Sequence, residues 1–324
     1  MNSSGFSLQD FAGLYSSQND RNIADRYREN FLEWLDAMKL PAGLIGDMSG
    51  VYIPFSNLLR KKFFESQKVP IIGISGPQGS GKSTFTAFAS AILENAYKYR
   101  VASFSIDDFY YTRAERNQLS RKVHPLLITR GVPGTHDVSL ALDVFKKLRS
   151  AGPESITQIP VFDKAVDDRL PQNMWNTFKG RPDIILFEGW CVGARPEPAK
   201  ELLNPVNDFE RESDIDHTFR DYVNEKLGSE YTKWFSEIDF LVMLKVRSFD
   251  QVYQWRLLQE IKLREKNLAL GKKSLQIMSE NELKFFISHY ERTTRNMLSE
   301  MPSRANMVMH IGDDHRIELI SVKN

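Results

Sequence analysis

The sequence contains very little cysteine. Its 324 residues include one, Cys191, which excludes an intramolecular disulfide framework and suits a reducing compartment. We interpret Cys191 as a small buried residue. The six histidines show no Cys/His spacing of the kind that holds zinc. The sequence therefore predicts neither a disulfide scaffold nor a structural zinc centre.

Long hydrophobic runs and an excess of one charge are also absent. No apolar run approaches the roughly 18 residues of a membrane span, and the start MNSSGFSLQDFAG lacks the features of a signal or transit peptide. The 43 basic and 42 acidic residues give a net charge of +1, so no long-range field attracts nucleic acid or an anionic membrane. We expect a cytoplasmic globular protein that binds neither.

The clearest motif that is present joins an apolar strand to a glycine-rich loop and a helix. It reads PIIGISGPQGSGKST and fills the pattern GxxxxGK[ST], whose backbone N–H groups surround nucleotide phosphates. Glycines allow positive φ and close approach to an anion, and the helix N-terminus adds partial positive charge. The alternative is a chance match within a turn. The pattern predicts ATP or GTP binding by Gly76, Pro77, Gln78, Gly79, Ser80, Gly81, Lys82, Ser83 and Thr84.

Strand and helix patterns alternate after this loop, which predicts an α/β fold with a doubly wound parallel sheet of the P-loop type. Further apolar runs lack in/out alternation, as buried parallel strands do. We predict strands at 71–75, 101–106, 184–187, 240–246 and 307–311, and helices at 82–93, 138–148, 249–269 and 280–301. Residues 1–65 carry a helical apolar stripe, so we expect a helical extension packed on a domain of residues 66–324.

An acidic pair follows the strand at 101–106. Asp107 and Asp108 would lie at the carboxyl edge of the parallel sheet, where ligands of such sheets bind. In phosphoryl transfer to an alcohol, an aspartate there can orient the acceptor hydroxyl and take its proton. We assign this role to Asp107. The alternative is that either residue only caps the turn, which we expect of Asp108.

A third strand end carries Glu188, in the segment PDIILFEGW. A carboxylate at this position can hold Mg²⁺ beside the Ser83 hydroxyl, so we expect ATP and Mg²⁺ as cofactors. The alternative is an ordinary solvated acid. No NKxD motif is present, and the one DxxG match precedes the phosphate loop, which argues against guanine specificity.

Taken together, these strand ends resemble the phosphoribulokinase and uridine kinase group of P-loop kinases, and within it the plant-type D-glycerate 3-kinases. The resemblance covers most of the chain. It rests on the segments GISGPQGSGKST, SIDDFY, RGVPGTHD, PVFDK, ILFEGW, DYVNEKL and QWRLLQE. It implies an ATP-dependent kinase that phosphorylates the 3-hydroxyl of D-glycerate; a nucleoside, pantothenate or a sugar phosphate stays open as the acceptor.

Two segments are candidates for binding a small anionic acceptor. The turn RGVPGTHD offers Arg130, Thr135, His136 and Asp137, although Asp137 could simply cap the next helix. The segment after PVFD offers two cations that could pair with a carboxylate, or form a solvated loop. These are Lys164 and Arg169.

The charged helices within 249–300 resemble the lid of related kinases, whose arginines meet the transferring phosphoryl group. We name Arg256 and Arg264 as lid candidates, with a solvated helix face as the alternative. The rival function from another class is a regulatory ATPase that acts on a protein partner, and a third is an interaction module without catalysis. The oligomeric state stays open.

Overall fold

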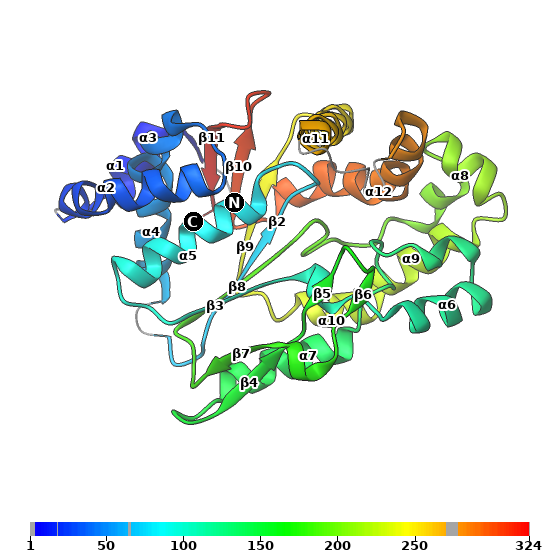
Figure 1. Cartoon of the computed structure of the whole chain (residues 1–324), viewed down its shortest axis with the longest axis horizontal. Helices are drawn as coiled ribbons and strands as arrows, with labels where there is room; N and C mark the ends of the chain where they lie inside the picture. The colour runs from blue at the N-terminus through cyan, green and yellow to red at the C-terminus, as the bar shows by residue number, and fades with distance from the viewer. Residues whose placement is uncertain (1–3, 18, 64–65, 270–277, 324) are drawn as a thin grey trace.

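A computed structural model describes residues 4–17, 19–63, 66–269 and 278–323. A seven-stranded sheet forms its centre, in the order β1-β11-β10-β9-β2-β8-β3 (Figure 1). The strands β10, β9, β2, β8 and β3 run parallel, whereas β11 is antiparallel to β10 and β1 is antiparallel to β11. Their bounds are β1 Ser4–Phe6, β2 Ile71–Ser75, β3 Val101–Ser105, β8 Ile184–Gly189, β9 Phe240–Lys245, β10 Met307–Ile311 and β11 Ile317–Val322.

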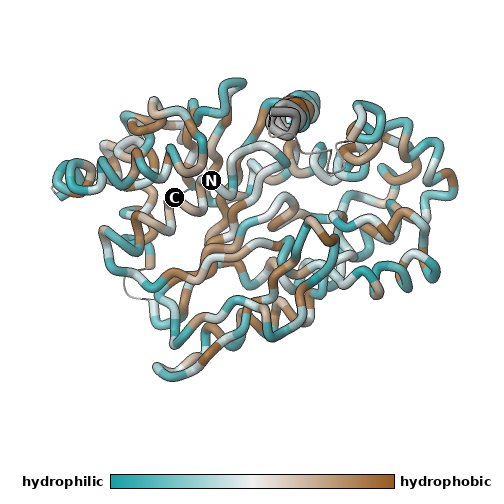
Figure 2. The backbone as a smooth tube through the Cα atoms, viewed as in Figure 1, coloured by the Kyte–Doolittle hydropathy of each residue, from teal (hydrophilic) through white to brown (hydrophobic). Residues whose placement is uncertain are grey.

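The central strands are buried on both faces because helices cover both sides of the sheet. Every residue of β2 and β8 is buried, and Figure 2 shows their hydrophobic colour at the centre of the molecule. In β2, Ile72 and Ile74 belong to one core and Ile71 belongs to the other. This two-sided burial explains why the sequence shows continuous apolar runs instead of alternation.

The helices are divided between the two cores. Helices α1, α2, α4, α5 and α11 contribute mainly to one core, and α7, α9 and α10 contribute to the other. The bounds are α1 Leu8–Tyr15, α2 Asp20–Ala37, α3 Ile45–Asp47, α4 Ile53–Phe63, α5 Lys82–Asn95, α6 Arg113–Lys122, α7 Val138–Ser150, α8 Asp208–Ser213, α9 Thr218–Gly228, α10 Glu230–Phe235, α11 Phe249–Ala269 and α12 Glu280–Glu300.

The N-terminal segment covers the outer face of α5 with aromatic side chains. The rings of Phe31 and Phe88 lie 4.6 Å apart between centroids, and those of Tyr52 and Phe85 lie 5.6 Å apart. Strand β1 of the same segment adds an edge to the central sheet. The boundary at residue 65 stays a prediction, since this segment supplies both a helical layer and a strand.

Two small antiparallel hairpins lie outside the central sheet. Strand β4 (Ile156–Ile159) pairs with β7 (Asn176–Lys179), and β5 (Phe162–Asp163) pairs with β6 (Asp168–Arg169). The β5–β6 hairpin packs on the short 3₁₀ turn Ile106–Phe109 that ends β3. Within the described residues, no helix has both the length and the apolar character that crossing a bilayer requires.

Candidate active site

The phosphate loop connects β2 to α5, as the sequence predicts. Gly79 and Gly81 have φ values of 80° and 85°, which L side chains rarely adopt. Gly76 is needed for a different reason. A Cβ added there would lie 2.6 Å from Ser80 Oγ and 3.0 Å from Leu244 Cβ. Positive φ is thus observed at two of the three glycines, and close packing accounts for the third.

Several polar atoms of this loop are buried and have no hydrogen-bond partner among the described residues. They are the hydroxyls of Ser75 and Ser80 and the side-chain oxygen of Gln78. Unpaired buried polar groups are costly in a folded protein. The two hydroxyls can donate to an anion, and their position beside a loop that begins a helix fits a site built for an anionic ligand. This arrangement fits the phosphates of a nucleotide.

Glu188 and Ser83 meet at the expected metal position. The Ser83 hydroxyl donates a 2.9 Å hydrogen bond to Glu188 Oε1. Glu188 is buried, and its Oε2 has no partner in the described structure. Mg²⁺ prefers oxygen ligands and often uses one carboxylate together with substrate phosphates. The residues present therefore fit Mg²⁺.

The two aspartates after β3 differ in environment. Asp108 Oδ2 accepts a 3.0 Å hydrogen bond from the Ser105 N–H, which closes the 3₁₀ turn and is the capping contact expected of it. Burial raises the pKa of Asp108 to about 6, and the nearby Asp107 and Glu188 add to the effect, while the Ser105 and Phe162 N–H groups oppose it. Asp108 therefore holds the local backbone.

Asp107 instead reaches across to the β5–β6 hairpin. Lys164 Nζ donates a 2.6 Å hydrogen bond to Asp107 Oδ2, and these side chains are 61% and 25% exposed. Burial alone would raise the pKa of Asp107, but the charges of Lys164 and Lys82 outweigh it and hold the pKa below the ordinary value. The structure thus brings Asp107, Lys82 and Lys164 into one electrostatic group.

Aromatic side chains fix the turn at residues 130–137. Trp190 Nε1 donates to the Gly131 carbonyl (2.9 Å), and the Tyr290 hydroxyl donates to the Arg130 carbonyl (3.2 Å). The Tyr231 hydroxyl accepts from the Gly134 N–H (2.9 Å). Sequence reasoning did not assign these aromatic residues to the turn, because they come from the residue after β8 and from α10 and α12, far along the chain.

Three predicted substrate residues of this turn have side chains that contact other residues of the protein. Thr135 is fully buried and its hydroxyl donates to the Val132 carbonyl at 2.7 Å, while Asp137 Oδ1 accepts from the Leu140 N–H (3.0 Å) at the start of α7. His136 is fully buried and its Nδ1 lies 2.5 Å from the Tyr231 hydroxyl. Burial lowers the pKa of His136 to about 3, so the ring is neutral.

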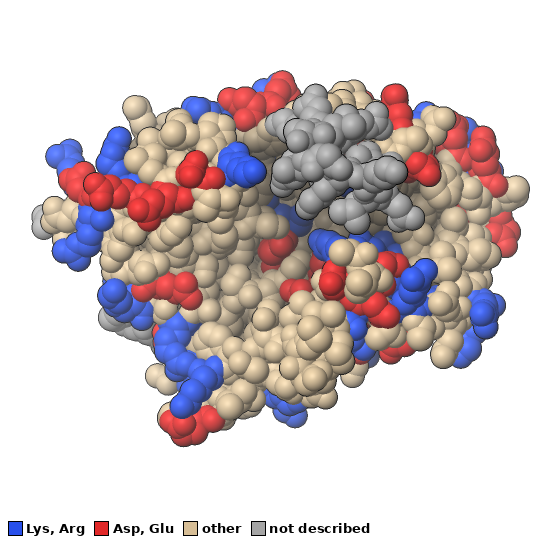
Figure 3. All heavy atoms as spheres, in the orientation of Figure 1, with Lys and Arg blue, Asp and Glu red and all other residues tan. Residues whose placement is uncertain are grey.

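The predicted substrate arginines are already paired with acids. Arg130 and the buried Arg116 both contact the Asp167 carboxylate at the end of the β5–β6 turn. Arg169 lies 3.3 Å from Asp137 and 3.5 Å from Glu115, and 12% of its side chain is exposed. Figure 3 shows basic and acidic side chains gathered over the β5–β6 hairpin (Figure 3).

We call Gly76–Thr84 with Glu188 the nucleotide half of the site. We call residues 130–137 with the β5–β6 hairpin the acceptor half. Asp107 links the nucleotide half to the acceptor half. Its carboxylate contacts Lys164 of the hairpin, and the charge of Lys82 lowers its pKa.

The lid candidates lie on α11. Arg256 NH2 is 2.5 Å from Glu260 Oε1, and its charge also acts on Tyr290 of α12. On this helix face Glu260 therefore pairs with Arg256, which lies one turn before it. The side chain of Arg264 falls outside the described residues.

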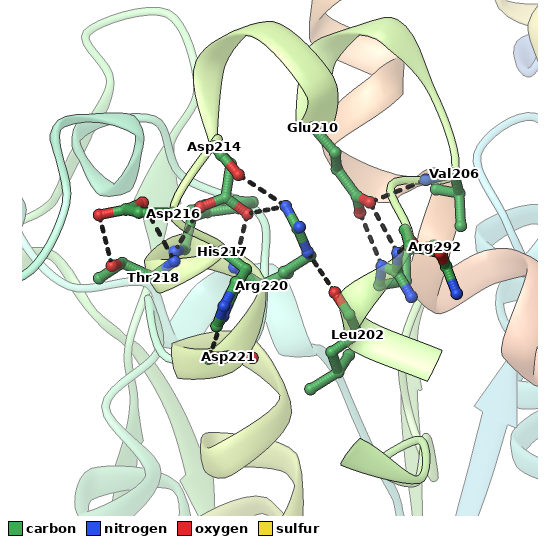
Figure 4. Close-up of polar contacts among 12 residues, drawn as sticks. Leu202, Val206, Glu210, Asp214, Asp216, His217, Thr218, Arg220, Asp221 and Arg292 are labelled. Carbon is green, nitrogen blue, oxygen red and sulfur yellow. Dashed lines mark hydrogen bonds and ion pairs between the residues drawn. The ribbon is translucent and has the colours of Figure 1, made fainter. Parts of the chain in front are cut away.

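A buried ionic network fixes α12 against α8. Arg292 NH2 lies 2.7 Å from Glu210 Oε2, and Arg220 NH1 lies 2.9 Å from Asp214 Oδ2 (Figure 4). The same arginines donate to backbone carbonyls, including that of Leu202 at 2.6 Å. Removing one partner of such a buried pair is strongly destabilising. These contacts hold the helical layer that carries Tyr290.

One group of side chains near this network has the spacing of metal ligands. Atoms of His124, Asp214 and Asp216 lie within 4.8 Å of one another. However, His124 Nδ1 accepts from the Leu126 N–H, and both Asp216 oxygens accept from Thr218. Internal hydrogen bonds therefore account for this cluster.

Comparisons with known proteins agree with this geometry. The chain is 35% identical over 257 residues to the uncharacterized kinase mug58 of Schizosaccharomyces pombe, covering 75% of this chain and 87% of that one. It is 33% identical over 243 residues to the chloroplastic D-glycerate 3-kinase of Arabidopsis thaliana, covering 72% of this chain and 49% of the plant protein. No protein-family model matches.

A solved structure shares the fold. The YGR205w protein aligns with a TM-score of 0.67 and 26% identity, over 84% of this chain and 97% of that one. The fold, the phosphate loop and the identities to kinases therefore agree. The chain belongs to the family of P-loop kinases that includes the plant D-glycerate 3-kinase, and it is an ATP-dependent small-molecule kinase.

Proposed function

We propose that this chain transfers the γ-phosphoryl group of ATP to the 3-hydroxyl of D-glycerate, giving 3-phosphoglycerate. The observation that carries the proposal is the position of Asp107 between Lys82 of the phosphate loop and Lys164 of the β5–β6 hairpin. Lys82 suits a phosphate and Lys164 suits a carboxylate, with Asp107 between them to receive the proton of a hydroxyl. The three side chains together therefore fit an acceptor that is both an alcohol and an acid. The name of the plant relative supports this choice.

In the nucleotide half, the N–H groups of Gly76–Thr84 surround the phosphates, and Lys82 reaches the β and γ phosphates. The N-terminus of α5 adds partial positive charge. Mg²⁺ held by Ser83 and Glu188 would neutralise charge that develops on the transferring group.

Transfer then needs a base on the acceptor side. As the 3-hydroxyl oxygen attacks the γ-phosphorus, its proton passes to the Asp107 carboxylate. The bond from the γ-phosphorus to the β,γ-bridging oxygen breaks, and ADP leaves with that electron pair. Arg256 on α11 would add positive charge from the lid. Asp107 later gives the proton to solvent.

In the acceptor half, we propose that Lys164 binds the carboxylate of D-glycerate. Arg130 and Arg169 would support it with positive charge, and the neutral His136 would shape the pocket wall. We assign Thr135 to the turn, because its hydroxyl donates to the Val132 carbonyl. We assign Asp137 to the start of α7, because its Oδ1 accepts from the Leu140 N–H, while its Oδ2 accepts from Arg169.

Purified protein with ATP and Mg²⁺ tests the proposal through ADP release in the presence of different acceptors. We expect D-glycerate to increase ADP release far above the rate without an acceptor, and phosphorus NMR to identify 3-phosphoglycerate. L-glycerate, glycerol, pantothenate, uridine and a pentose phosphate are the comparison compounds. Preference for any of these five would overturn the proposal, and stimulation by a protein alone would favour the regulatory ATPase.

A further inference from the structure

The candidate base, Asp107, forms an ion pair with Lys164. Asp107 Oδ2 accepts from Lys164 Nζ at 2.6 Å, although the two residues lie 57 positions apart in the sequence. Lys164 follows β5, in the turn of the hairpin, where Asp163 Oδ1 accepts from the Ala165 N–H at 2.8 Å. One carboxylate oxygen of the proposed base, Oδ2, is therefore already bonded to a cation.

The other cations in the acceptor half, and Arg116 of α6 beside it, are held more firmly than Lys164. Arg116 is 1% exposed and shares Asp167 with Arg130, and Arg169 is 12% exposed and contacts two acids. Lys164 is 61% exposed, and among the described residues its acidic partner is Asp107. An exposed lysine ion pair contributes little stability and exchanges partners easily. Lys164 is thus the cation that an incoming anion can take most readily.

We propose that the carboxylate of the acceptor takes Lys164 away from Asp107, and that this exchange makes Asp107 Oδ2 available to the acceptor hydroxyl. The inference rests on the proposed function and adds a basis for specificity to it. A neutral alcohol of the same size can donate a hydroxyl but cannot compete for the ammonium. Lys164 would then act as a specificity residue that links recognition of the acid to release of the base.

The electrostatics of Asp107 support the exchange. The positive charges that face it are Lys164 from the hairpin and Lys82 from α5, with the neutral His136 beside them. The groups Tyr110, Tyr290 and Cys191 around it have raised pKa values and stay uncharged. The neighbouring Asp108 carboxyl, with a pKa of about 6, adds negative charge beside Asp107 when it ionises. When Lys164 moves to the acceptor carboxylate, Asp107 loses one of its two stabilising cations. Its pKa then rises, which makes it a better proton acceptor.

Substitution of Lys164 tests this link through a comparison of two acceptors. In Lys164→Met, we expect kcat/KM for D-glycerate to fall at least about 10²-fold, since a charge-assisted contact to the acceptor carboxylate is lost. We expect kcat/KM for glycerol to stay the same or rise, because Asp107 is already free. The acidic limb of the pH profile should move to higher pH. Lys164→Arg should recover part of the preference for the acid.

The matched control is Lys179→Met on β7. Lys179 is also an exposed lysine, 65% exposed and paired with Glu154, but it lies on the other hairpin. We expect it to leave both acceptors unchanged. If Lys164→Met lowers kcat/KM for D-glycerate and glycerol by the same factor, Lys164 has only a structural role and the inference is wrong.

A direct measurement separates this inference from the proposed function. Carbon-13 NMR of aspartate-labelled protein, with the Asp107 signal assigned from Asp107→Asn, gives the pKa of Asp107 in the presence of Mg²⁺ and a non-hydrolysable ATP analogue. We expect D-glycerate to raise this pKa and glycerol to leave it unchanged. Calorimetry reports D-glycerate binding in the same sample. Binding without a change in the pKa of Asp107 would overturn the exchange, whereas absence of binding would overturn the proposed function itself.

Discussion

The nucleotide half and the acceptor half of the site differ in whether their polar side chains already have partners. In the nucleotide half, the hydroxyl of Ser80 and one oxygen of Glu188 are buried without partners among the described residues, as is the hydroxyl of Ser75 at the end of β2 beside them. In the acceptor half, Arg130, Arg169 and Lys164 are each paired with an acid. The nucleotide half is therefore preorganised for its ligand, whereas binding in the acceptor half must exchange existing partners.

Lys82→Ala should have the largest effect, because it should impair both the nucleotide half and the acceptor half. In the proposed mechanism Lys82 binds the nucleotide phosphates, and its charge also lowers the pKa of Asp107. We expect turnover to fall about 10³-fold and ATP binding to weaken, because a charged contact to the transferring group is lost. Steady-state kinetics and titration calorimetry measure the two effects. Unchanged ATP affinity would contradict the assignment.

Asp107→Asn should separate the halves. The substitution removes the proposed base and does not change the residues of the phosphate loop, so we expect kcat to fall about 10²- to 10³-fold while ATP affinity changes little. A single-turnover assay with a calorimetric ATP titration checks both values. Full activity in this variant would remove the base assignment.

Gly76→Ala should damage only the nucleotide half. The added Cβ would meet Ser80 Oγ and Leu244 Cβ, so we expect a loss of about 1–3 kcal/mol in the free energy of unfolding, together with weaker ATP binding. Gly13→Ala is the matched control, since a Cβ on Gly13 in α1 meets nothing within 4 Å. The control should stabilise the protein by up to about 1 kcal/mol. Urea unfolding of both variants tests the contrast.

Asp108→Asn should have the smallest effect on activity, and its effect on stability should depend on pH. The pKa of Asp108 is raised from 3.8 to about 6 in the folded protein, so the folded state loses stability as pH rises through this interval. An asparagine keeps an oxygen for the Ser105 N–H without the buried charge. We expect the variant to gain up to about 3 kcal/mol relative to wild type above pH 6, and no such gain in acid.

Thermal or urea unfolding at several pH values measures this difference. The same stability difference at every pH would contradict the buried-charge explanation. Activity of Asp108→Asn provides a further check, because a capping residue should leave most turnover intact.

The sequence predicts the fold well wherever a strand is buried on both faces. The runs that form β2, β8, β9 and β10 are continuous and apolar, so they stand out. Strand β11 was missed because its exposed and buried positions are mixed at the sheet edge, and β1 was missed because it has three residues. Edge strands bury less apolar surface, so their sequence signal is weaker.

For the site, too, local sequence patterns could be predicted and contacts between distant residues could not. The phosphate loop, Asp107 and Glu188 were predicted from local patterns at strand ends, and the structure brings them together. Their roles stay predictions. The bond from Lys164 to Asp107 and the shared Asp167 were not predicted, because no local pattern encodes which acid a distant cation will meet. Tyr231 and Tyr290 fix the turn from other helices and are equally invisible to a linear motif.

The pairing of β1 with β11 has a consequence for how the chain folds during synthesis. Ser4–Phe6 leaves the ribosome long before Val322, and the two ends of the described chain lie close together in Figure 1 (Figure 1). A contact of such long sequence separation forms late, since its loop-closure entropy must be met first. The sheet edge that β1 completes therefore stays open until β11 has been synthesised, and a chain that stalls before β11 would leave the edge of β10 exposed to other chains.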